Sequence, residues 1–219
     1  MAKHECRNTG VTIHSAEKRD FQACAELFKQ VYLAEFSRNF FLRGLRKPRC
    51  QAMFFAVMIL VYATSFSVTL TLISLCISLY LFSVYLHRRV SRFVNKQRDV
   101  MNIEKYYASD RSNYWVAKSV DGVIVGTVAI LETKNKDVAM LKRLVIKKEF
   151  QSQGLGIRLV EHALNFCQEA RYKEVKLICS ECLPRALKLY RKLGFSAVPR
   201  EKWLTAISYD CILELNQVN

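Results

Sequence analysis

The chain is short of acidic residues: 19 Asp and Glu stand against 34 Lys and Arg in 219 residues, a net charge of +15. An excess of this size suits an anionic partner, such as nucleic acid, an acidic membrane surface or the phosphates of a cofactor. Five Lys and Arg lie in residues 38–49 and five in 88–98, on either side of one apolar run, where they can instead orient a membrane segment. Because they gather there rather than on one folded face, we expect no nucleic-acid partner.

We also expect neither a cleavable signal peptide nor a disulfide framework. The first fifty residues are polar and carry no early apolar core. Cys179 and Cys182 form a lone Cys-x-x-Cys with no second pair, so we expect no metal site, and a redox role is the lesser alternative because cytosolic thiols stay reduced. Four other cysteines fall on apolar faces, as buried reduced thiols do: Cys24, Cys76, Cys167 and Cys211.

No Lys, Arg, Asp, Glu, Gly or Pro occurs between Ala52 and Leu86, a run of 35 residues. One straight helix of that length would measure about 50 Å, well beyond a hydrocarbon core of about 30 Å, whereas two arms of about 17 residues would each reach about 26 Å. We therefore predict a membrane segment that turns near its centre. Hydroxyl side chains gather at that midpoint: Thr64, Ser65, Ser67, Thr69 and Thr71.

Two familiar phosphate-binding loops are absent. The chain has no Gly-Lys-Ser/Thr after the loop, which excludes a P-loop. It also has no Gly-x-Gly-x-x-Gly followed by a ribose-binding acid, which argues against a dinucleotide fold. The chain has instead the loop Gln151-Ser152-Gln153-Gly154-Leu155-Gly156, between an apolar strand pattern and an amphipathic helix pattern. A strand, glycine loop and helix present backbone N–H groups to a phosphate. Gly154 and Gly156 permit a sharp turn and a close approach of the ligand.

A second pattern follows at Pro184–Phe195, of the form Ala-x-x-Leu-Tyr-x-x-x-Gly-Phe. Together with Gln-x-x-Gly-x-Gly in the same order, it resembles the GNAT superfamily of acyl-CoA N-acyltransferases. That resemblance implies an α/β fold with a mixed, mostly antiparallel central sheet flanked by helices, here with an inserted membrane helical hairpin. It also implies acetyl-CoA as co-substrate and no metal.

The expected organisation has four parts. Residues 1–49 supply the first strand and helix, 50–87 a membrane hairpin or re-entrant pair, 88–110 a basic amphipathic helix beside the membrane, and 111–219 the main acyl-CoA-binding part. The amphipathic helix has an alternative, in which it packs on the core with a solvated basic face.

Local signals place several elements of this fold. Val11–His14 alternates as a strand does, and Asp20 is expected to cap a helix running to about Phe36. Asp121-Gly122 predicts a hairpin between two apolar runs. Further strands are expected near residues 175–179, 195–198 and 205–215.

The membrane run interrupts one folding domain, which constrains its topology. The first strand and helix must pack on the later part, so both must lie on the same side of the bilayer, and the chain must cross an even number of times or dip in and return. The symmetric basic flanks place both ends in the cytosol.

The resemblance also implies roles for individual residues. The backbone donors of residues 151–156 would bind the pyrophosphate, and Ile157 would also contact the cofactor. The preceding strand would splay from its neighbour, so that the backbone of Leu144, Val145 and Ile146 pairs with the pantetheine arm. Tyr190 would protonate the departing thiolate; the alternative is a core tyrosine on an amphipathic helix. No ready base stands on the glycine-loop strand, where Lys142 and Arg143 occur, so water, an acid from elsewhere or a deprotonated amine must serve. Arg143 either holds a substrate carboxylate or is a solvent-facing strand residue.

The whole chain resembles the camello-like branch, which includes cysteine-S-conjugate N-acetyltransferases of the endoplasmic reticulum. This implies a membrane-anchored N-acetyltransferase facing the cytosol, with lipid as a partner and the α-amine of a small cysteine-conjugate-like amino acid as acceptor. The alternatives are a protein lysine N-acetyltransferase of the same membrane and an acyl-CoA-binding membrane protein without turnover. No oligomeric state is predicted.

Overall fold

The computed structural model describes residues 10–203 and 206–215, in which one mixed sheet carries the order β1-β2-β3-β4-β5-β7-β6. Neighbouring strands are antiparallel except β4 and β5, which are parallel. The predicted mixed, mostly antiparallel sheet is confirmed. The strands are β1 Thr12–Ser15, β2 Asn113–Lys118, β3 Ile124–Glu132, β4 Val138–Ile146, β5 Glu174–Ser180, β6 Ser196–Trp203 and β7 Ala206–Glu214.

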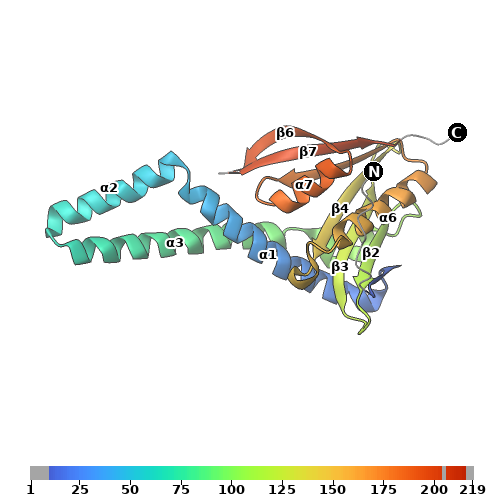
Figure 1. Cartoon of the computed structure of the whole chain (residues 1–219), viewed down its shortest axis with the longest axis horizontal. Coiled ribbons are helices and arrows are strands. Elements are labelled where there is room, and N and C mark those ends of the chain that lie inside the picture. Colours follow the sequence, from blue (N-terminus) through green and yellow to red (C-terminus); the bar gives the residue numbers. More distant parts are fainter. Residues whose placement is uncertain (1–9, 204–205, 216–219) are drawn as a thin grey trace.

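Helices cover both faces of this sheet (Figure 1). The helices are α1 Phe21–Leu45, α2 Pro48–Ser65, α3 Val68–Asn95, α4 Arg98–Met101, α5 Ile103–Tyr106, α6 Leu155–Glu169 and α7 Pro184–Lys192. Side chains of β2 alternate between the faces, as the pleat requires. Tyr114 and Val116 pack with Cys24 of α1, whereas Trp115 and Ala117 pack with Leu159 of α6.

Helices α2 and α3 form a hairpin that projects away from the sheet (Figure 1). Both are long and apolar enough to cross a membrane, and only 6% of the most apolar window of each is buried within the chain. The turn lies in the predicted hydroxyl cluster, where Phe66 takes a left-handed φ of 50°. Hydroxyl side chains there donate hydrogen bonds to backbone carbonyl oxygens of the same helix; for example, Ser65 Oγ donates to Val61 O at 2.7 Å. Such bonds satisfy hydroxyl groups for which lipid chains offer no hydrogen-bond partner.

The segment after the hairpin differs from the prediction of one amphipathic helix over 88–110. Helix α3 continues to Asn95, and only the short helices α4 and α5 follow. Val90 and Val94 are buried against Phe36 and Phe40 of α1, so this part of α3 packs on the core. The core-packing alternative is therefore the one that the structure supports.

Helix α1 is longer than predicted, and its start is built differently. It ends at Leu45 rather than near Phe36, because its second half packs along α3: a Cβ on Gly44 would stand 2.8 Å from the ring of Phe82. Asp20 lies at the N-cap but makes no capping bond to α1. Its carboxylate pairs instead with Lys118 of β2, at 2.8 Å.

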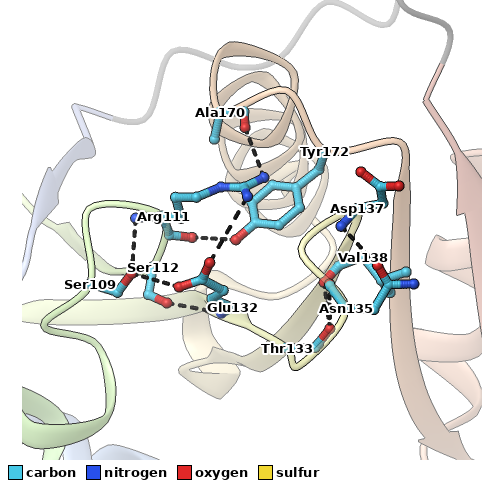
Figure 2. Close-up of polar contacts among 10 residues, drawn as sticks. All are labelled: Ser109, Arg111, Ser112, Glu132, Thr133, Asn135, Asp137, Val138, Ala170 and Tyr172. Atoms are coloured by element: carbon cyan, nitrogen blue, oxygen red, sulfur yellow. Dashed lines mark hydrogen bonds and ion pairs between the residues drawn. The ribbon is translucent and has the colours of Figure 1, made fainter.

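A polar network joins the start of β2, the end of β3 and the end of α6 (Figure 2). Arg111 donates to the carbonyl oxygen of Ala170 at 3.0 Å and its guanidinium lies over the ring of Tyr172 at 4.3 Å. The Tyr172 hydroxyl donates to Arg111 O at 2.7 Å, and Ser109 donates to Glu132 at 2.8 Å. The network therefore ties α6 to the sheet at the end where β4 begins.

We expect Tyr172→Phe to lower the free energy of unfolding by about 1 kcal/mol, because it leaves the carbonyl oxygen of Arg111 without this donor. Chemical unfolding of the purified protein in detergent measures the change. Acetyl-CoA affinity should stay at the wild-type value, since the glycine loop lies at the opposite end of α6; a loss of affinity would contradict this separation.

Candidate active site

A cavity of about 1010 Å³ lies where β4 ends, between α1, the glycine loop, the start of α6 and α7. Nine of the ten residues predicted to bind the cofactor line it: Leu144, Val145, Ile146, Gln151, Ser152, Gln153, Gly154, Gly156 and Ile157. The tenth, Leu155, is 2% exposed and packs in the core instead.

One wall of the cavity is an unpaired strand edge. Strands β4 and β5 pair from Val138 opposite Glu174 to Met140 opposite Lys176, and no pairing follows, although β4 continues to Ile146. Apart from the carbonyl oxygen of Ile146, which accepts from the side chain of Gln151, the backbone groups of β4 beyond Met140 on that side are open to another extended chain. This is the splayed geometry that the sequence resemblance implied for residues 144–146.

A bulge lies in the same stretch of β4. Ala129 pairs with Lys142 and Thr127 with Val145, so β4 holds one extra residue between these pairs. Arg143 takes a left-handed φ of 58° there, and Thr127 Oγ1 donates to its carbonyl oxygen at 2.8 Å.

The glycine loop leaves its backbone donors free. Among the described residues, no acceptor is found for the N–H groups of residues 152–156, and the last of them open α6, whose first N–H groups have no partner within the helix. Gly154 has a φ of 84°, which favours glycine. A Cβ on Gly156 would stand 2.7 Å from Leu189 Cδ1 and 3.0 Å from Ile146 Cδ1, so a side chain at this position has room only if these two side chains shift.

The side chain of Gln151 joins three elements around the loop. Its Nε2 donates to Glu35 of α1 at 2.7 Å and to the carbonyl oxygen of Ile146 at 3.0 Å. Its Oε1 accepts from Arg185 of α7 at 2.6 Å. Gln151 thus acts here through its side chain, by holding the loop against both helices.

Four cations and one carboxylate line the cavity: Arg38, Arg185, Lys188, Lys192 and Glu35. The positive excess suits phosphate groups. The sequence analysis missed these residues on α1 and α7. A signal did exist on α1, where Val31, Glu35, Arg38 and Asn39 recur at helical spacing and so share one face.

Tyr190 does not line the cavity. It is 6% exposed, packs in the core and meets the ring of Phe195 at 5.6 Å. Burial raises the pKa of its hydroxyl, so the phenol is protonated at neutral pH. Its role as proton donor to the thiolate stays a prediction.

Arg143 is neither solvent-facing nor in the cavity lining. Its side chain is 10% exposed; Nε donates to Asp99 Oδ2 at 2.8 Å, Nη2 donates to Gln97 at 2.8 Å, and the guanidinium lies over Phe28 at 4.8 Å. Burial alone would raise the pKa of the Asp99 carboxyl. The hydrogen bonds and the positive charge of Arg143 outweigh this effect, so the pKa of Asp99 is lowered. The solvent-facing interpretation is wrong, and a substrate carboxylate would have to compete with Asp99.

The cysteine pair is buried. Cys179 and Cys182 are free thiols, 3% and 0% exposed, and burial raises the pKa of Cys179 to about 12. Because the thiolate is the reactive form, this environment favours inert reduced thiols over a redox role. Cys24, Cys167 and Cys211 are buried as predicted, whereas Cys76 is exposed on α3.

Fold and cavity together define an acyl-CoA-dependent acyltransferase. Residues 81–195, more than half of the chain, match the acetyltransferase (GNAT) family, and the chain belongs to this family. It is an acetyl-CoA-dependent N-acetyltransferase of the GNAT type.

Relatives place it in the camello-like branch. It is 32% identical over 111 residues to "Probable N-acetyltransferase camello" of Xenopus tropicalis, covering 50% of this chain and 49% of that one. It is 28% identical over 190 residues to "N-acetyltransferase 8" of Rattus norvegicus, covering 84% of this chain and 85% of that one. With the same identity over 190 residues, the match to "N-acetylaspartate synthetase" of Homo sapiens covers 85% of this chain and 62% of that one.

Solved structures share the fold at low identity. An acetyltransferase of the GNAT family from Staphylococcus aureus superposes with a TM-score of 0.60 at 15% identity, covering 94% of this chain and 99% of that one. The Paia N-acetyltransferase of Thermoplasma acidophilum, solved with coenzyme A, superposes with a TM-score of 0.57 at 14% identity over the same shares.

Proposed function

We propose that this protein is a membrane-anchored N-acetyltransferase that transfers the acetyl group of acetyl-CoA to the α-amine of a cysteine S-conjugate, by direct attack within a ternary complex. The observation that carries the proposal is the cavity where β4 ends. It combines an unpaired strand edge, free N–H donors and an excess of cations in one continuous space.

Each part of acetyl-CoA has a matching surface. The pyrophosphate is assigned to the N–H groups of residues 152–156 at the start of α6, where the helix dipole favours an anion. Arg185, Lys188 and Lys192 stand nearby for the remaining phosphate. The pantetheine arm is assigned to the free edge of Leu144–Ile146, which leads the thioester toward the bulge at Arg143.

The chemistry rests mainly on positioning. A thioester held by strand and loop, with an amine directed at its carbonyl carbon, gains on the order of 7–11 kcal/mol in favourable intramolecular cases. The amine must arrive neutral, and Glu35 is the carboxylate found among the described residues of the cavity lining. Its bond to Gln151 places it at the phosphate end, so we assign it to holding the loop rather than to taking the proton.

A cysteine S-conjugate fits a membrane-bound enzyme, since its apolar substituent partitions toward lipid beside the hairpin. Aspartate is the second candidate acceptor, because several relatives are named N-acetylaspartate synthetase. Membranes that contain the full chain should therefore be given acetyl-CoA with S-benzyl-cysteine, aspartate or a lysine peptide, and the N-acetyl product measured by mass spectrometry. We expect S-benzyl-cysteine to react fastest; faster acetylation of aspartate or the peptide would overturn the acceptor assignment.

The hairpin is proposed to anchor the protein in the endoplasmic reticulum membrane with the acyltransferase domain in the cytosol. Helix α2 has 18 residues, about 27 Å at 1.5 Å per residue, just under a hydrocarbon core of about 30 Å. The exposed apolar side chains of both arms support insertion. Strand β1 and helix α1 pack on β2 to β4, so the two flanks share one side of the membrane.

Engineered glycosylation sites at the two termini test this topology. Both should stay unmodified in cells, because both termini are expected in the cytosol. A site placed at Phe66, on the turn between α2 and α3, serves as the comparison, since glycosylation there would indicate a full crossing and its absence a re-entrant pair. Modification at one terminus only would contradict the hairpin.

A further inference from the structure

A second cavity, of about 470 Å³, lies beside the end of α1. Its volume falls within the range of small-ligand sites, about 300–1,000 Å³. Neither β4 nor the glycine loop contributes to it, so the proposed acetyl transfer leaves it without a role. Its lining consists of Asn39, Leu42, Arg43, Arg46, Lys47 and Pro184, of which Asn39 and Pro184 also border the larger cavity.

Two polar side chains of this second cavity are fixed to the loop between β5 and α7. Arg43 Nη1 pairs with the Glu181 carboxylate at 3.1 Å, and its Nη2 donates to the carbonyl oxygen of Glu181 at 3.0 Å. Asn39 Nδ2 donates to the carbonyl oxygen of Cys182 at 2.8 Å. These contacts between α1 and the loop therefore hold one wall of the cavity in place without a ligand.

The other two cations of the cavity, Arg46 and Lys47, have no counter-charge. Both are exposed, and neither side chain has a hydrogen bond or an ion pair with another described residue. The carboxylate of Glu181 is already occupied by Arg43 and by the backbone N–H of Ile207, which donates to it at 3.0 Å. The first turn of α2 contains no acidic side chain. This unbalanced positive charge suits a phosphate group.

The second cavity lies at the base of the hairpin, where α1 leads into α2 (Figure 1). The 18 residues of α2 span about 27 Å, so with the hairpin inserted the start of α2 lies at the level of the lipid headgroups. The neighbouring helix agrees: Gly44 packs against the ring of Phe82 on α3, and Tyr85, one turn further, is 50% exposed. Exposed tyrosines are typical of the membrane–water interface. Arg46 and Lys47 are therefore in reach of lipid phosphates.

Resting on the proposed membrane anchoring, we propose that the second cavity binds the headgroup of an anionic phospholipid. Arg46 and Lys47 contact its phosphate, and Asn39 and Arg43 form the wall against which it lies. Basic flanks orient a membrane segment by their charge alone and need no cavity for that role. A cavity with one fixed wall and two unpaired cations at headgroup level is what distinguishes a binding site from such a flank.

Lipid titration of the purified full-length protein tests the proposal. The protein in a neutral detergent is given dioctanoyl phosphatidylserine or dioctanoyl phosphatidylcholine, and the bound lipid is counted by native mass spectrometry. We expect the wild type to bind phosphatidylserine at least about tenfold more tightly than phosphatidylcholine. Arg46→Gln/Lys47→Gln should bind phosphatidylserine about 25-fold more weakly, since each Lys or Arg near an anionic surface contributes about fivefold. Its thermal unfolding should match the wild type, because neither side chain has a partner among the described residues.

Arg88→Gln/Arg92→Gln is the matched control. It removes two exposed cations from α3 beside the same membrane surface but outside the second cavity. We expect it to weaken phosphatidylserine binding less than about threefold, because exposed charges outside a site are largely screened by salt. An equal loss in both double variants would show a general attraction to the basic flanks and would overturn the site. Equal affinity of the wild type for the two lipids would overturn it as well.

Two further measurements separate the possible sources of the phosphate. Glycerol phosphate binding as tightly as phosphatidylserine would assign the cavity to a soluble ligand. A loss of acetyl-CoA affinity in Arg46→Gln/Lys47→Gln would assign the two cations to the cofactor, and either result overturns the lipid assignment.

Failure of this inference can be told from failure of the proposed function. The titration needs neither acetyl-CoA nor an acceptor, so its result does not depend on acetyl transfer. Release of the wild type from membranes by alkaline carbonate would show that the hairpin is not inserted, and the proposed anchoring would fail together with this inference. Loss of lipid selectivity in a protein that resists carbonate would overturn this inference alone.

Discussion

Gly156→Val is expected to lower acetyl-CoA affinity at least about 100-fold. A Cβ at this position already approaches the terminal methyl groups of Leu189 and Ile146 to 2.7 and 3.0 Å, and the two further methyl groups of valine add bulk there, so we expect the first turn of α6 to shift. The displaced first turn of α6 then no longer directs its N–H groups at the pyrophosphate, and each charge-assisted bond lost costs about 1.5–3 kcal/mol. Calorimetric titration of the purified protein with acetyl-CoA measures the loss.

Gly122→Ala is the control for that experiment. Gly122 has a φ of 74° in the turn between β2 and β3, and a Cβ there would meet nothing within 4 Å. The substitution carries the cost of a left-handed residue, about 1–2 kcal/mol of stability, but lies outside the cavity. Its acetyl-CoA affinity should equal the wild type; an equal loss in both variants would show that general destabilisation, not the loop, sets the affinity.

Asp99→Ala is expected to lower the free energy of unfolding by about 3–5 kcal/mol, because it leaves the guanidinium of Arg143 buried without its counter-charge. Both side chains of the pair are at most 10% exposed, and Tyr107 also loses its acceptor at 2.9 Å. Chemical unfolding in detergent gives the value. The double variant Asp99→Ala/Arg143→Met should recover part of the loss, since no unpaired charge remains.

The exposed pair Lys173 and Asp137 provides the control, with side chains 62% and 51% exposed. Asp137→Ala should change stability by less than about 1 kcal/mol. The wild type should also lose stability at low pH. The pKa of Asp99 is lower in the folded protein than its usual 3.8. The ion pair therefore stabilises the fold fully above pH 3.8, and this stabilisation is lost as the pH falls through the pKa of Asp99 in the folded protein. An Asp99→Ala variant as stable as the wild type would contradict the account of this pair.

The cofactor side of the site could be predicted from the sequence because it is local. Residues 151–156 combine glycine, a preceding strand and a following helix within one short segment, and all of them except Leu155 line the cavity. The hairpin turn at Phe66 was equally local, marked by hydroxyl residues at the midpoint of an apolar run.

The other wall could not be predicted because it depends on contacts across the chain. Gln151 meets Glu35 across a separation of 116 residues, and Arg143 meets Asp99 across 44. Spacing along the sequence says nothing about such pairs. Tyr190 was assigned from its place in a motif, whereas its burial against Phe195 depends on how α7 packs in the fold.

The central claim is that acetyl transfer takes place in the cavity where β4 ends, and thiol release tests it most directly. Membranes that contain the wild type and membranes that contain Gly156→Val should each be given acetyl-CoA, once with the amine S-benzyl-cysteine and once without it, and the release of CoA thiol compared. We predict amine-dependent release of CoA thiol by the wild type and a loss of at least about 100-fold in the variant at acetyl-CoA concentrations below the wild-type KM. Equal amine-dependent release by both proteins would place the reaction elsewhere and contradict the account.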